Sequence, residues 1–194
     1  DHEIAFNEIY RVTLETGDCG AIYTGRSWIG RGTVIKHNFI HHTGGVGMGS
    51  LGVYLDDMAC DQRILGNIFW NVTRAAHVGG GHDNVYMNNL FVDCQPAVFF
   101  DGRGTRGGSW AEMTDMLRRQ VRDLPPAIAR AYREHYPAFA RVERIARLSG
   151  AMPPQGNVIA HNVCSSPEWL EWGFGAMPGM AHIDRNLIDN DPLF

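Results

Sequence analysis

Short runs of alternating apolar and polar residues recur along the chain, and most of them end next to an asparagine. The runs are rich in β-branched and aromatic residues and are separated by Gly, Asn and Asp, which is typical of short strands. The asparagines are 31, 29, 22, 73 and 24 residues apart. A repeat of about 20–50 residues indicates a solenoid. The repeated asparagines are Asn7, Asn38, Asn67, Asn89, Asn162 and Asn186.

Strand-like repeats with many glycines favour stacked β-coils over helical repeats. We therefore expect an all-β fold, a right-handed parallel β-helix, with each coil about 4.8 Å above the last. The asparagines would stack inside one bend and bond the turn amides and each other. We expect residues 1–103 and 156–194 to form the coils, as a fragment of a longer solenoid, and residues 104–155 to form a helical insertion.

The segment 104–155 interrupts the strand pattern. Its apolar residues recur at i, i+3 and i+4 spacing, which predicts an amphipathic helix ending at Pro125-Pro126. A second helix is expected at about 127–135 and a third after Pro137. The segment holds 9 of the 17 basic and 5 of the 21 acidic residues. We expect it to cap the neighbouring coils. The residues that define the first helix are Trp110, Met113, Leu117, Val121 and Leu124.

A second phrase repeats between the asparagines, at 21–25, 52–56, 75–79 and 97–101. Because strand side chains alternate between faces, two columns of each phrase should point inward and two outward. The inward columns are Ile22, Val53, Ala76 and Val98, and Thr24, Leu55, Val78 and Phe100. The outward columns are Tyr23, Tyr54, His77 and Phe99, and Gly25, Asp56, Gly79 and Asp101.

Asp56 and Asp101 share an outward column two coils apart, which predicts about 9–10 Å between their backbones. Gly79 lies between them and should leave open space. Two carboxylates across a small gap are the requirement of glycoside hydrolysis, one as acid and the other as base or nucleophile. We expect Asp56 and Asp101 to form this catalytic pair, with Asp57 able to replace Asp56 and His77 as a positioning or polarising group.

Residues around these acids suit a sugar. Aromatic rings along the same ribbon could stack on it, and arginines could bind its hydroxyls or a uronate carboxylate. No metal or other cofactor is expected for hydrolysis. The expected substrate-binding residues are Tyr23, Arg26, Tyr54, His82, Phe99 and Arg103.

The stretches Gly52–Ala59, Gly66–Phe69, Val78–Val85 and Asn88–Cys94 resemble bacterial β-helix proteins of polysaccharide breakdown. Within that group the chain is most similar to the glycoside hydrolases that include an α-L-fucosidase and a xylanase. The resemblance covers residues 1–103 and 156–194. It implies a polysaccharide or oligosaccharide substrate, two catalytic Asp residues on neighbouring coils at Asp56 or Asp57 and Asp101, and a secreted or periplasmic location.

Two other functions stay open. A polysaccharide lyase would use Ca²⁺ held by Asp56, Asp57 and Asp101, with Arg103 as the base. A glycan-binding or adhesin shaft would have no catalytic residues. The net charge of −4 does not indicate a nucleic-acid partner, and no apolar run is long enough to span a membrane.

Overall fold

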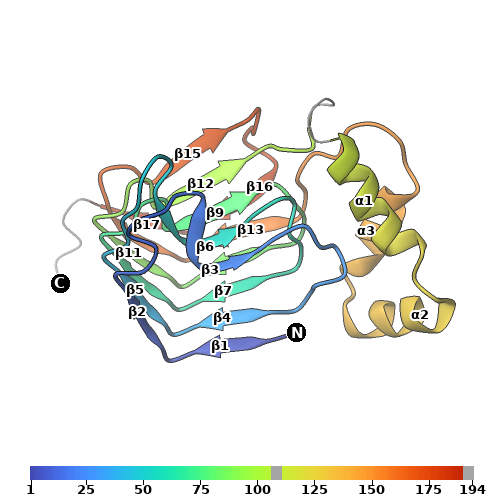
Figure 1. Cartoon of the computed structure of the whole chain (residues 1–194), viewed down its shortest axis with the longest axis horizontal. Coiled ribbons are helices and arrows are strands. Elements are labelled where there is room, and N and C mark those ends of the chain that lie inside the picture. Colours follow the sequence, from blue (N-terminus) through green and yellow to red (C-terminus); the bar gives the residue numbers. More distant parts are fainter. Residues whose placement is uncertain (106–110, 190–194) are drawn as a thin grey trace.

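The computed structural model describes residues 1–105 and 111–189, so Trp110 of the first predicted helix lies outside the described residues. Three parallel sheets run side by side through the structure, and successive strands of the chain enter them in turn (Figure 1). Each circuit of the chain thus adds one strand to each sheet. The chain climbs from β1 at one end of the stack to β16 and β17 at the other.

The strands are short, and most contain three or four residues. Sheet A contains β1 (Glu3–Ala5), β4 (Val34–Lys36), β7 (Arg63–Leu65), β10 (Val85–Met87), β13 (Asn157–Ala160) and β16 (Ala181–Asp184). Sheet B contains β2 (Glu8–Tyr10), β5 (Phe39–His41), β8 (Ile68–Trp70), β11 (Leu90–Val92), β14 (Val163–Ser165) and β17 (Leu187–Ile188). Sheet C contains β3 (Cys19–Thr24), β6 (Ser50–Leu55), β9 (Ala76–Gly79), β12 (Val98–Asp101) and β15 (Leu170–Gly173).

The asparagines form one continuous column at the bend between sheets A and B. The backbone N–H of each donates to Oδ1 of the asparagine in the next coil, at 2.9–3.1 Å. Each Nδ2 also donates to that same oxygen, at 2.9–3.1 Å. The bend amides are therefore paired although the bend is buried, as the repeats predict. A second column, which the sequence did not indicate, joins Gln62, Asn84 and Asn157.

The two predicted inward columns of sheet C are confirmed by the strand register, which pairs Ile22 with Val53 and Leu55 with Val78. These side chains pack in the main apolar cluster with the inward residues of the other sheets. Sheets A and B contribute Ile35, Ile64, Tyr86, Ile159, Ile40, Phe69, Phe91 and Cys164.

The predicted all-β class is wrong, because three helices build a substantial part of the fold. They are α1 (Ala111–Arg122), α2 (Pro126–His135) and α3 (Phe139–Ala146). Pro126 starts α2, where its fixed φ suits the first helical turn. The buried stripe of α3 joins α1 and the loops of the stack in a second apolar cluster, distinct from the first. The described fold is thus a stack of three parallel sheets with a helical layer against one side (Figure 1).

Candidate functional site

The candidate site lies where the strands of sheet C end. β6 stops at Leu55 and is followed by Asp56 and Asp57, whereas β12 ends in Asp101. The register pairs Asp101 with Gly79, and Leu55 with Val78 one position earlier. Asp56 and Asp101 therefore occupy one column with a glycine between them, as the repeated phrase predicts.

Arg103 occupies the space between these acids, which the sequence predicted to be open. Its Nη1 lies 2.6 Å from both Asp56 Oδ1 and Asp57 Oδ1. Its Nη2 and Nε lie 2.7 and 2.9 Å from Asp101 Oδ2. One guanidinium thus joins three carboxylates from two coils. The acids do not face each other across a cleft.

Two of the acids also hold the turns that follow their strands. Asp56 Oδ1 accepts a hydrogen bond from the Asp57 N–H at 2.8 Å. Asp101 Oδ1 accepts one from the Arg103 N–H at 2.6 Å. Charge-assisted bonds to backbone amides are short and strong, so both carboxylates have a structural role in the turns.

Glycines on the intervening coil let Arg103 cross it. Gly79 lies against the backbone of Asp56, and a Cβ there would lie 2.7 Å from the Leu55 carbonyl oxygen. Gly80 has a φ of +77°, and a Cβ there would lie 2.8 Å from the Arg103 carbonyl oxygen. A side chain at either position would press on the backbone that positions the cluster. The space that the sequence predicted at Gly79 is therefore used by the neighbouring coils.

Burial and the neighbouring charges shift the pKa values of Asp101 and Arg103. Asp101 is fully buried, and Asp56, Asp57 and Arg103 are at most 8% exposed. Burial raises the pKa of Asp101, and the Arg103 guanidinium opposes that rise. For Arg103, burial lowers the pKa, but Asp101 and then Asp56 and Asp57 raise it above its ordinary value. Arg103 therefore stays charged and is unsuited to act as a base.

The aromatic column differs from its prediction. Tyr54, His77 and Phe99 do point away from the main cluster, but all three are buried. Ring centroids of successive coils lie 4.5 and 4.7 Å apart, so each ring covers the next, and Arg74 lies 4.3 Å above Phe99. The predicted roles of Tyr54 and Phe99 as ligand contacts, and of His77 between the acids, are therefore not supported by their positions.

His77 is held neutral. Burial lowers its pKa well below the ordinary value, and the positive charges of Arg103 and Arg74 lower it further. A neutral histidine between two aromatic rings packs without the cost of a buried charge. This position explains its burial better than a role in proton transfer does.

The exposed part of the site is its rim. Tyr23 is 49% exposed, and its hydroxyl donates to Asp56 Oδ2 at 2.9 Å. Burial and the bond to Asp56 raise the pKa of Tyr23 to about 12, so it remains a donor. The exposed Arg26 donates from Nε to Asp57 Oδ2 at 2.6 Å. Phe174, which the sequence did not single out, is 65% exposed and lies 5.9 Å from the Arg103 guanidinium.

The helical layer reaches this rim. The Gln120 side chain on α1 donates to the Arg26 carbonyl at 2.9 Å and accepts from the Trp28 N–H at 2.9 Å. Both bonds hold the loop that follows β3, which contains Arg26 and Trp28. The layer is therefore coupled to the site through this loop.

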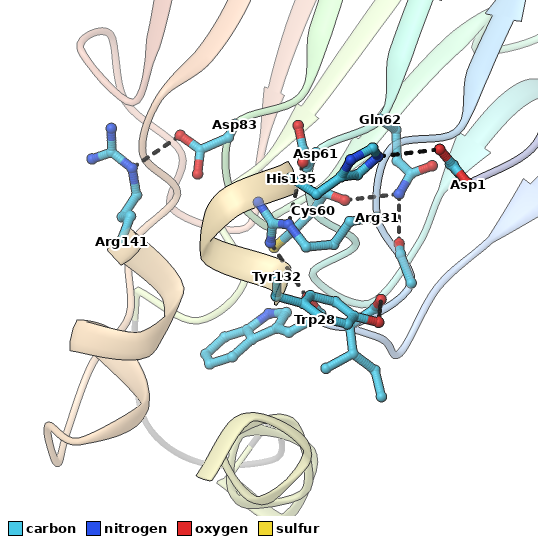
Figure 2. Close-up of polar contacts among 12 residues, drawn as sticks. Asp1, Trp28, Arg31, Cys60, Asp61, Gln62, Asp83, Tyr132, His135 and Arg141 are labelled. Atoms are coloured by element: carbon cyan, nitrogen blue, oxygen red, sulfur yellow. Dashed lines mark hydrogen bonds and ion pairs between the residues drawn. The ribbon is translucent and has the colours of Figure 1, made fainter. Parts of the chain in front are cut away.

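His82, which the sequence predicted to bind substrate, lies elsewhere. It is buried beside Trp28 in the junction between the stack and the helices. Burial lowers its pKa to about 3, with Arg141 and Arg31 adding to the effect. Figure 2 shows this junction, in which Arg31 reaches Asp61 and Arg141 reaches Asp83. His82 therefore belongs to the interface that docks the helices.

Within residues 1–105 and 111–189, no group of three or more His, Cys, Asp or Glu side chains is placed to hold a metal ion. The same residues contain no helix that is long and apolar enough to cross a membrane. Searches against protein-family models, curated proteins and solved structures each found no match.

Proposed function

We propose that this chain binds a carbohydrate at the rim formed by Tyr23, Arg26 and Phe174, without cleaving it. The observation that carries the proposal is the position of Arg103, which engages Asp56, Asp57 and Asp101 at 2.6–2.7 Å. Carboxylates bound in this way have few lone pairs left for a substrate. The cluster then serves as a rigid base for the exposed side chains around it.

The rim has the side chains that sugar recognition needs. Two exposed aromatic rings offer apolar faces with polar or charged neighbours. The planar guanidinium of Arg26 is mostly exposed and can donate to hydroxyls or to a uronate carboxylate. Because Tyr23 is bonded to Asp56 and Arg26 to Asp57, both side chains are held by the buried ion cluster before a ligand arrives, which lowers the cost of binding.

Titration calorimetry with a panel of neutral and uronate oligosaccharides tests the proposal. We expect Tyr23→Ala and Phe174→Ala each to weaken binding at least tenfold, whereas Phe6→Ala, at an exposed aromatic in the bend between β1 and β2, leaves it unchanged. Tyr23→Phe keeps the ring and separates stacking from the bond to Asp56. Equal binding by the parent and by the Tyr23→Ala and Phe174→Ala variants would refute the rim as the site.

Hydrolysis is the second candidate, because burial raises the pKa of Asp101 and a glycosidase needs an acid of raised pKa. Arg103 would first have to leave the acids. Release of reducing ends by the parent chain, lost in both Asp56→Asn and Asp101→Asn, would favour hydrolysis over binding alone. The lyase is disfavoured, since the three acids raise the pKa of its expected base.

A further inference from the structure

The helical layer is rich in arginine. The segment 104–155 contains nine arginines and no lysine. Some of these arginines have structural partners, such as Arg141, which binds Asp83 of the stack at 2.9 Å. Others are exposed and, within residues 1–105 and 111–189, have neither an ion pair nor a side-chain hydrogen bond, so they are available to a ligand. These exposed arginines are Arg119, Arg122, Arg144 and Arg147.

Helix ends account for part of this pattern. Arg119 and Arg122 lie in the last turn of α1. Arg144 lies in the last turn of α3, and Arg147 is the C-cap of that helix. A positive charge at such a position interacts favourably with the free carbonyls of the helix end, a role that all four arginines share. Arg122 and Arg147 differ from the other two because they also line a pocket, together with Arg133 of α2.

The pocket lies where the end of α1, the first turn of α2 and the end of α3 meet, within the helical layer of Figure 1. Its volume is about 280 Å³. Two of the residues that line it, Val121 and Ala146, are 7% and 1% exposed and belong to the second apolar cluster, against which Leu124 also packs. Because close packing holds these side chains in place, the pocket is formed before a ligand binds.

The charged residues that line the pocket favour an anion. They are Arg122, Arg133, Arg147 and Glu143, three positive charges and one negative charge, a net of +2. Arg133 Nη1 donates to Glu143 Oε1 at 2.7 Å, which holds this guanidinium in place and leaves its other N–H groups for a ligand. A guanidinium matches a carboxylate or a phosphate with two parallel hydrogen bonds. Three guanidinium groups around one small pocket therefore suit a ligand with more than one negative charge.

We propose that this pocket binds a small anion that carries two or more carboxylate or phosphate groups. Arg122 and Arg147 supply the charges that the described part of the chain leaves unpaired, and Arg133 supplies a third contact that Glu143 holds in place. The ligand is compact, because the pocket is at the small end of ligand sites, which span about 300–1,000 Å³. The site shares no residue with the rim formed by Tyr23, Arg26 and Phe174, so it does not depend on sugar binding there.

Titration calorimetry with pyrophosphate and with citrate tests the site, and acetate serves as the singly charged comparison. We expect Arg122→Gln and Arg147→Gln each to weaken binding about tenfold, the effect of losing one hydrogen bond to a charged group. Arg119→Gln and Arg144→Gln are the matched controls, because each lies three residues earlier and removes the same charge from the same helix end without lining the pocket. Binding of pyrophosphate alone would identify a phosphate ligand, and binding of citrate alone a carboxylate ligand.

Glu143→Gln provides a test of opposite sign. It removes the negative charge from the pocket and keeps an amide oxygen that can accept from Arg133, so we expect tighter binding of the anion. Absence of binding by the parent to both polyanions at millimolar concentration would overturn the proposal. So would equal weakening in the control variants, acetate binding as tight as that of the polyanions, or no gain in affinity in Glu143→Gln. Circular dichroism checks that each variant folds, and if Glu143→Gln does not, the comparison of the four exposed arginines still decides the proposal.

Discussion

Replacing Arg103 by Met tests whether the cluster is a closed ion network. The substitution keeps much of the aliphatic stem and removes the guanidinium that contacts all three carboxylates of Asp56, Asp57 and Asp101. It leaves three buried acids together, with Arg26 at the surface on one of them. We expect a large loss of stability, because unpaired buried charges are costly.

The magnitude follows from burial. Removing one partner of a buried ion pair costs about 3–5 kcal/mol, and here one residue serves three partners. Against a total stability of about 5–15 kcal/mol, this is a substantial fraction. The matched control is Arg26→Met, which removes an exposed arginine from Asp57 and should change stability little.

Urea unfolding followed by fluorescence and circular dichroism measures the free energies of unfolding of the two variants. Equal dependence of these free energies on urea concentration shows that the variants differ in stability and not in the surface exposed on unfolding. The deficit of Arg103→Met should shrink as pH falls, because protonation neutralises Asp101, whose pKa is raised by burial and by the nearby charge of Asp56. Asp101→Asn, which keeps the oxygen that accepts from the backbone N–H of residue 103, should restore part of the loss in the Arg103→Met background. A loss no larger than that of Arg26→Met would refute the closed network.

Three further predictions concern the stack and the helical junction. The pKa of His82 is about 3 in the fold against 6.5 ordinarily, so between these values the unfolded chain binds more protons and the free energy of unfolding decreases as the pH is lowered. Urea unfolding at each pH should show a loss of about 2 kcal/mol from pH 7 to pH 5, and a smaller loss in His82→Gln. Gly80→Ala should lower the melting temperature, because its φ of +77° costs an L-residue about 1–2 kcal/mol and its Cβ would also contact the Arg103 backbone. Gly150→Ala, at a φ of +90° with nothing within 4 Å, measures the cost of positive φ alone, so the difference between the two variants gives the cost of the contact. Asn67→Ala should cost about 2–4 kcal/mol in the same assay, because it leaves buried donors and acceptors of the column unpaired, whereas Asn7→Ala at the exposed end should cost much less.

Much of the stack could be read from the chain because its determinants are local. Alternation places Val53 and Leu55 inward whatever the neighbouring coil contains, and the repeated asparagine marks the same bend in each coil. The helices were also predictable in position, since apolar spacing in α3 puts Phe139, Val142 and Ile145 on one face. How extensively the helices pack against the sheets could not be predicted, because it depends on contacts with Trp28 and Met58 of the stack.

The exposure of the outward side chains was predicted less well. Alternation correctly turned Tyr54 and His77 away from the main core, but stacked rings about one strand spacing apart cover each other and leave no exposed ribbon. Phe174 carried no signal, since it lies outside every repeat and meets Arg103 only through the folding of a loop.

The sequence by itself determined the repeat, the register of sheet C and the column shared by Asp56, Gly79 and Asp101, because periodic side-chain direction specifies all three. Only the tertiary structure decided that the gap in that column is filled. A long arginine side chain can turn back across a glycine coil, and neither its direction nor its reach is set by strand periodicity. That one side chain converts a predicted pair of catalytic acids into a buried ion cluster.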